Sequence, residues 1–206
     1  MSHVTNFSGM LIAKHRISCL NDTIVTFCPQ LELVKGNHYR TWADDHGGKL
    51  YGDYPLPAGM TEAMIGNNAE YIIRVKPEVN AEKYNSAAYE IGVVPMDYER
   101  DNQGNVIVDA QGNPKSVYYR PDSQFYGLCC DQFLQGCGIL ECEGVGKYRE
   151  EKGKPVAFDQ LYMEYQVMLN QQVAKENGDA FSWERQKDGS FISLTSPNPL
   201  RVAIGA

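Results

Sequence analysis

The most chemically dense segment of this chain lies between residues 38 and 46. It combines two histidines, an arginine, a tryptophan and two adjacent carboxylates, namely His38, Arg40, Trp42, Asp44, Asp45 and His46. An indole can stack on a flat ligand, a guanidinium can grip a phosphate or carboxylate, and carboxylate and imidazole groups can transfer protons. The segment therefore predicts a binding pocket. The alternative is a strand end, with the tryptophan in the core and the two carboxylates on a solvated turn.

A metal site is a second hypothesis for the same region. Asp44, His46 and Asp53 would supply the three ligands that a hydrolytic metal needs beside an open position for water. The sequence has no HExxH pair to anchor such a site, no serine in a GxSxG turn, and no P-loop or dinucleotide fingerprint. We therefore expect no metal and no cofactor, and we assign no catalytic residue.

Four of the six cysteines lie close together in the second half of the chain, at Cys129, Cys130, Cys137 and Cys142. Paired metal ligands usually lie two residues apart on a tight turn, whereas adjacent residues in a regular element point in different directions. Without an export signal, six cysteines in a chain of this size indicate reduced thiols. We expect the four to pack as small hydrophobic side chains.

The charge and apolar pattern exclude two classes of partner. The formal charge of −7 and a pI near 5.1 make the average field repel phosphate backbones, and the densest basic stretch is only three residues long. We therefore expect no nucleic-acid partner. No run of about 18 apolar residues is present, and Met1 to Lys14 carries no secretion signal, so we predict no membrane partner and a cytoplasmic location.

The sequence predicts a single domain of 206 residues, because apolar segments recur along its whole length without a linker or repeat. A long loop rich in glycine and proline is predicted at 43–69, and a β-ribbon insertion at 97–120. Apolar periodicity predicts helices at 21–28, 121–136 and 158–177.

Strands follow from β-branched and aromatic runs bounded by turn residues. Besides a short N-terminal strand, they are expected at 31–34, 38–42, 69–75, 87–95, 106–108, 116–119, 180–185 and 191–195. The first pair forms a hairpin through Gly36-Asn37, and the last pair forms a terminal hairpin. Hairpins mixed with single helices predict an α+β fold: an antiparallel or mixed sheet, about three helices packed on one face, and the β-ribbon insertion.

Several short motifs are shared with a known family. They are the Met1-Ser2-His3-Val4 leader, Ala69–Val75 followed by Tyr89–Val93, Tyr126–Asp131, the helix Leu161–Gly178 with Tyr165 and Ala174, Glu184, and the turn Asp188-Gly189-Ser190. In these motifs the chain resembles the uncharacterised conserved open-reading-frame family of cyanobacteria and algal plastids, also seen in phages. The resemblance implies an intracellular α+β accessory protein, sometimes encoded near an AAA-class ATPase, with no established catalytic residues. The long loop and the ribbon would be insertions relative to the shorter plastid members.

The preferred hypothesis is a non-catalytic intracellular binding or adaptor protein that acts through its loop and ribbon surface on a protein partner or a small-molecule ligand. A phage-encoded protein or an accessory to an AAA-class ATPase would fit it. One alternative is an enzyme or sequestering protein for a nucleotide or another phosphorylated small molecule. Another is an oligomeric structural or assembly protein that pairs through edge strands. Whether the chain is an enzyme stays open.

Overall fold

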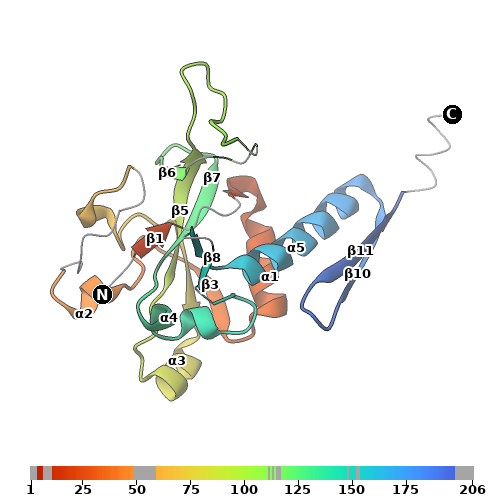
Figure 1. The fold of residues 1–206 in the computed structure, drawn as a ribbon. Coiled ribbons are helices and arrows are strands. Elements are labelled where there is room, and N and C mark those ends of the chain that lie inside the picture. Colours follow the sequence, from red (N-terminus) through yellow and green to blue (C-terminus); the bar gives the residue numbers. More distant parts are fainter. Residues whose placement is uncertain are drawn as a thin grey trace.

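The computed structural model describes residues 4–6, 11–48, 59–110, 112, 114, 117–147, 149–151 and 154–197. Its core is a curled antiparallel sheet with helices against it, which confirms the α+β prediction (Figure 1). The strands of this sheet are β1 (Val4–Asn6), β2 (Ile12–Ala13), β3 (Leu31–Lys35), β4 (Tyr71–Val75), β5 (Ile91–Tyr98), β6 (Val117–Tyr119) and β7 (Phe125–Asp131). Their order is β1-β7-β5-β4-β3, with β2 paired to β7 and β6 paired to β5.

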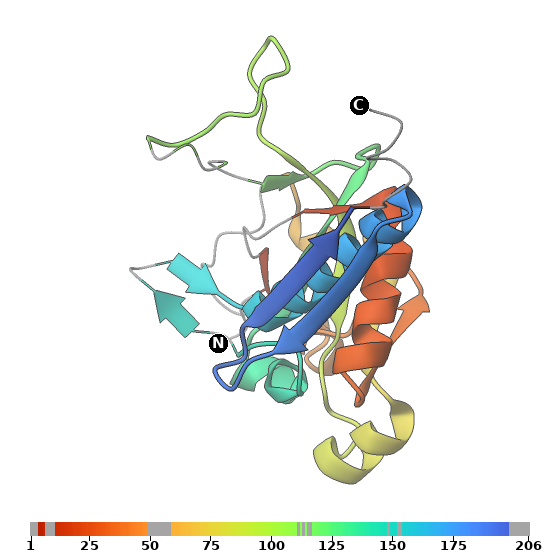
Figure 2. The same cartoon turned by 90° about the vertical axis from the view of Figure 1, so that its right-hand side faces the viewer.

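Two small antiparallel sheets lie outside the main one. The first pairs β8 (Arg149–Glu151) with β9 (Lys154–Val156). The second pairs β10 (Ala180–Arg185) with β11 (Phe191–Ser196), as the sequence predicts for its end. Figure 2 shows this second pair, which we call the terminal ribbon, lying across a long helix, and no other described strand pairs with it.

The described residues contain five α-helices: α1 (Ile17–Phe27), α2 (Trp42–Asp45), α3 (Pro77–Tyr84), α4 (Leu134–Cys137) and α5 (Asp159–Asn177). The two longest, α1 and α5, pack against each other and cover one face of the sheet (Figures 1 and 2). Helix α1 begins four residues before the predicted start because Cys19 and Leu20 are buried in the core, while Asn21 and Asp22 lie on its exposed side. Helix α3 is absent from the prediction. Among the described residues no helix is both long and apolar enough to cross a membrane.

The predicted helix at 121–136 is wrong. Residues Phe125–Asp131 form β7, which lies between β1 and β5 in the sheet. A strand buried on both faces has a continuous apolar run instead of an alternating one, and such a run cannot be told from a helix by periodicity. Leu128 and Cys130 face α1 and α5, whereas Cys129 faces the opposite side.

The predicted hairpin of 31–34 with 38–42 is also wrong. Strand β3 pairs with β4 in the register Leu31↔Val75, far along the chain. Residues 38–41 are not a strand, and Trp42 begins α2. The predicted loop at 43–69 contains α2 and a 3-10 turn at Glu62–Met64, with residues 49–58 outside the described part.

The predicted β-ribbon at 97–120 forms only in part. Arg100 pairs with Val106 and Val108 with Pro114 in isolated bridges, so no regular strand forms at 106–108. This segment stands away from the body in Figure 1, where no neighbouring strand extends the pairing. Strand β6 instead joins the main sheet through β5.

The sheet buries side chains on both faces. On β5, Ile91 and Val93 pack toward α1 and α5, while Val94 and Met96 belong to a second apolar cluster on the opposite face. That second face is covered by the irregular segments on either side of the undescribed residues 49–58, and Tyr39 is its largest fully buried side chain. Each face therefore has its own cover.

Gly92 on β5 has no side chain, which allows the ring of Tyr39 to pack directly against the sheet. A Cβ atom at this position would lie 2.4 Å from the ring of Tyr39. We predict that Gly92→Ala lowers the free energy of unfolding by about 1–3 kcal/mol through overpacking, measured by urea denaturation. Tyr39→Leu removes the ring, so the double variant should cost less than the sum of the two single changes. Additive costs would show that the contact is not the cause.

Candidate binding site

The predicted binding segment folds into α2 and the residues that lead into it. Thr41 precedes the helix, and its backbone N–H donates to Asp44 Oδ2 at 2.7 Å, which forms the start of a capping box. The backbone N–H of Trp42 donates to Oδ2 of buried Asp131 at 3.1 Å. Asp131 is the last residue of β7, so this hydrogen bond fixes the short helix to the end of that strand.

His38 and Asp44 lie together. His38 Nε2 is 2.8 Å from Asp44 Oδ1, and His38 Nδ1 is 3.0 Å from Asn67 Oδ1. These groups line a cavity of about 330 Å³, together with Thr41, Ala43, Gly48, Glu62, Ala63 and Ile65. The cavity lies between the two segments that cover the second face of the sheet. It offers carboxylate, amide and imidazole groups for hydrogen bonding.

The remaining predicted site residues lie outside the lining of this cavity. Arg40 Nη2 is 2.7 Å from Asp45 Oδ1, and that hydrogen bond raises the pKa of the Arg40 guanidinium. Arg40 also donates to the carbonyl of Ser86. The ring of His46 stacks on Trp42 at 3.5 Å between centroids, with its Nδ1 3.0 Å from the Trp42 carbonyl oxygen. The six predicted residues are thus neighbours, but they form three local pairs instead of one convergent pocket.

The metal hypothesis gains no support from the described residues. They contain no group of three histidine, cysteine or carboxylate side chains able to hold a metal ion. Asp53, one of the proposed ligands, lies outside the described residues.

The four neighbouring cysteines are free thiols. Cys129, Cys130 and Cys142 are buried, and Cys137 is half-buried. Burial raises the pKa of Cys129 to about 12, which keeps this thiol protonated at neutral pH. Cys129 and Cys130 pack into opposite faces of the sheet, as adjacent residues of a strand must. Their packing agrees with the role of small hydrophobic side chains.

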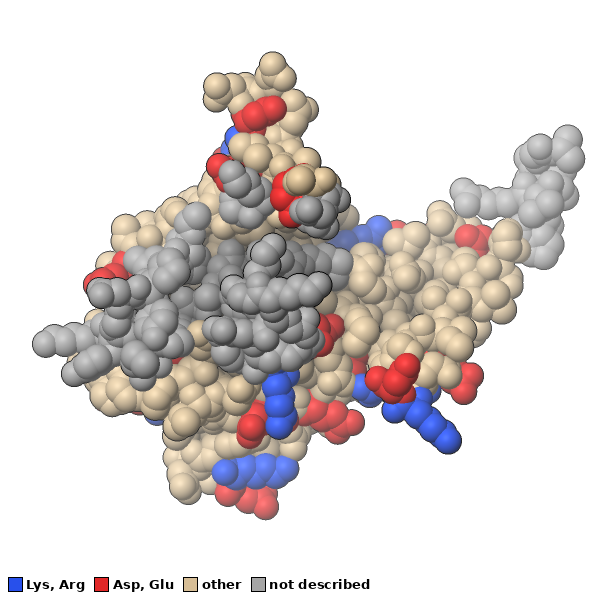
Figure 3. Space-filling view, viewed as in Figure 1, with Lys and Arg blue, Asp and Glu red and all other residues tan. Residues whose placement is uncertain are grey.

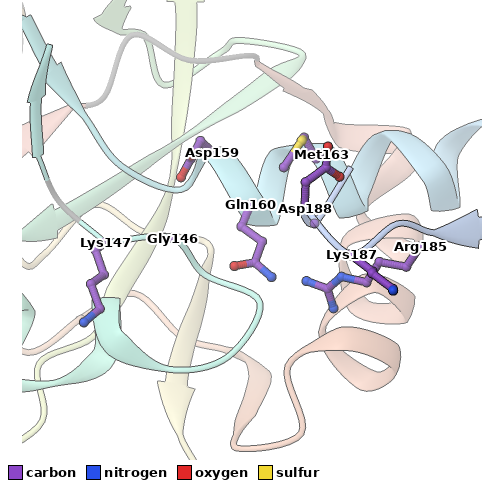
Figure 4. Close-up of a pocket in the computed structure, with 9 residues that line it drawn as sticks. Gly146, Lys147, Asp159, Gln160, Met163, Arg185, Lys187 and Asp188 are labelled. Atoms are coloured by element: carbon purple, nitrogen blue, oxygen red, sulfur yellow. The ribbon is translucent and has the colours of Figure 1, made fainter. Parts of the chain in front are cut away.

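A second cavity of about 470 Å³ lies between the start of α5 and the turn of the terminal ribbon. Its lining residues, shown in Figure 4, are Gly146, Lys147, Asp159, Gln160, Met163, Arg185, Lys187, Asp188 and Gly189. Three cations and two carboxylates share this lining, so their charges largely balance. The arrangement favours no strongly charged ligand.

Glu164 lies behind this cavity and is fully buried. Its Oε1 accepts from Arg185 Nη2 and from Gln160 Nε2, each at 3.1 Å, while Oε2 has no hydrogen-bond partner among the described residues. Burial raises the pKa of this carboxyl group to about 7, and the hydrogen bond from Gln160 and the charge of Arg185 oppose the shift. Glu164 is not among the site residues predicted from the sequence, although its spacing after Leu161 places an acid on the apolar side of the helix.

Three comparisons with known proteins gave no match: no family model, no curated protein and no solved structure is similar to this chain. The site must therefore be interpreted from its own geometry.

The capping contact of Asp44 should contribute more to the free energy of unfolding than the surface contact of Asp45. We predict that Asp44→Ala lowers the free energy of unfolding by about 1 kcal/mol, because it removes the partner of the Thr41 N–H. Asp45→Ala is the matched control and should cost less than about 0.5 kcal/mol, because it removes only a partly exposed ion pair. Urea denaturation measures both. A larger cost for Asp45 would contradict the capping role.

Glu164 should make stability depend on pH. Its pKa is raised from 4.5 in the unfolded chain to about 7 in the folded protein, so the native state holds a proton that the unfolded state has released. The free energy of unfolding should fall by up to about 3 kcal/mol as pH rises from 4.5 to 7. Glu164→Gln should flatten the curve in this window, measured by denaturation across pH. The exposed Glu184→Gln is the control, and an unchanged curve in Glu164→Gln would refute the assignment.

Proposed function

We propose that this protein is a non-catalytic binding or adaptor protein that acts through contacts with a protein partner. The observation that carries the proposal is the outer face of the terminal ribbon. Ile192 and Leu194 lie side by side on this face and are 61% and 65% exposed. Isolated exposed apolar residues are common, whereas contiguous exposed apolar side chains mark contact surfaces, and these two neighbours are the start of such a patch.

The segment 38–46 supports binding more than catalysis. Its histidines, arginine and carboxylates bond to one another or to nearby backbone, as in the pairs His38–Asp44 and Arg40–Asp45. A catalytic group must reach a reacting atom. These side chains are instead engaged in contacts that fix the segment against its neighbours. The proposal also includes the segment at 97–120, because it is an exposed loop that stands away from the body of the protein (Figure 1), and such loops commonly carry binding functions.

A second candidate function is binding or turnover of a phosphorylated small molecule. The observation that favours it is the 2.8 Å contact between His38 Nε2 and Asp44 at the edge of a cavity, because a carboxylate can orient an imidazole for proton transfer. The resemblance to the plastid and phage family adds to the first proposal an accessory role beside an AAA-class ATPase. A cytoplasmic location belongs to the same proposal.

The adaptor proposal predicts a partner that depends on the terminal ribbon. The double variant Ile192→Ser, Leu194→Ser should recover at least tenfold less of a partner protein than the wild-type chain, because it removes the apolar contact area. Affinity isolation from the native cells with quantitative mass spectrometry measures this. Leu134→Ser is the control, since Leu134 is 71% exposed on α4, far from the ribbon in Figure 1. Equal recovery with all three proteins would contradict the proposal.

A further inference from the structure

Strand β11 has a free edge. It pairs with β10 on one side, and no described strand pairs with it on the other. A two-stranded ribbon is marginally stable unless it packs on other structure or gains a further strand. The terminal ribbon packs on α1 through Trp183 and Phe191, whose rings contact Phe27 at centroid distances of 5.2 and 5.7 Å. Its outer edge has no such support from the described residues.

The edge lacks the features that normally protect a strand from pairing. Native proteins place charges, proline or a bulge on edge strands to prevent association. The β11 sequence FISLTS contains no charged residue and no proline, and its register with β10 is continuous from Phe191 to Ser196. Among the described strands of more than three residues, β11 is unique in having no charged side chain. Five of its six residues are exposed.

The hydrogen-bond pattern between β10 and β11 shows which backbone groups of β11 point toward its free edge. The N–H of Gln186 donates to the carbonyl of Ser190 at 2.8 Å across the turn. Bonded and non-bonded pairs alternate along an antiparallel ladder. Phe191, Ser193 and Thr195 therefore direct their N–H and C=O groups away from β10. These groups have no hydrogen-bond partner within the described part of the chain.

We infer that this edge binds the same edge of a second copy of the chain, in a two-fold antiparallel pairing centred on Ser193. In that register Ser193 lies opposite its copy and Phe191 lies opposite Thr195, so the outward groups of both strands bond to each other. The inference rests on the proposed function as a binding protein and specifies one partner for the ribbon.

Charge favours this location for self-association. The chain carries a formal charge of −7, so contact between two copies is least opposed where neither surface carries acids. Pairing along β11 brings no charged β11 side chains together, whereas pairing along β10 would involve Glu184 and Arg185. Figure 3 shows a mostly uncharged surface, with a few charged side chains, on the right-hand side, where Figure 1 draws α5 and the terminal ribbon. A two-fold contact uses one patch on both copies.

Charge substitution at the dyad tests the pairing. The wild-type protein should sediment as a dimer of the 23.1 kDa chain at micromolar concentration. Ser193→Lys and Ser193→Glu should each raise the dimer dissociation constant at least tenfold, because like charges then lie directly opposite. An equimolar mixture of the two variants should restore a heterodimer. Ser182→Lys is the control, because it places the same charge on β10 and should leave the dimer intact.

Circular dichroism and thermal melting of each variant distinguish loss of pairing from loss of folding. A monomeric wild-type protein at high micromolar concentration would overturn the inference, as would a Ser193→Lys dimer of unchanged affinity or a mixture that fails to associate. The proposed function fails separately. A monomer that still retains a partner through Ile192 and Leu194 refutes only the dimer, and a dimer without any other partner refutes only the adaptor.

Discussion

The central strands of the sheet must be buried on both faces. Strands β4, β5 and β7 carry apolar side chains on each side, so a single layer of helices cannot remove them from water. Helices α1 and α5 cover one face. The other face needs a second cover, which the chain builds from the irregular segments around α2 and the turn at Glu62–Met64. Because the second face is covered by irregular segments, many polar side chains lie in parts of the chain without regular secondary structure.

In an irregular segment the backbone N–H and C=O groups do not bond to one another as they do in a helix or a sheet. Side chains must therefore supply their hydrogen-bond partners. Glu90 accepts from the N–H of Arg40, and its own N–H donates to the Arg40 carbonyl. Asp131 accepts from Trp42 in the same way. The segment that suggests a reactive site in the sequence is therefore attached to the sheet through its backbone, by two carboxylates that lie outside the segment. The proposed binding surface on the terminal ribbon does not use these groups.

Local signals were sufficient for part of the fold. The helix at Asp159–Asn177 and the ribbon that follows it match the prediction closely, because a long amphipathic stripe and a two-strand turn are encoded by near neighbours in sequence. The strand Tyr71–Val75 is also confirmed, because its isoleucine, valine and tyrosine side chains favour a strand locally. The candidate site was predicted as one pocket, and the structure keeps only His38 and Asp44 at a cavity.

Local patterns in the chain are enough to predict the class of the fold, the terminal helix and ribbon, and the grouping of polar residues at 38–46. Long-range packing makes Phe125–Asp131 a central strand, pairs β3 with β4 and starts α2 at Trp42. The two sets of features differ in the range of the interactions involved. Periodicity and turn chemistry act between near neighbours, whereas strand partners, two-sided burial and the capture of Trp42 by Asp131 join residues far apart in the chain.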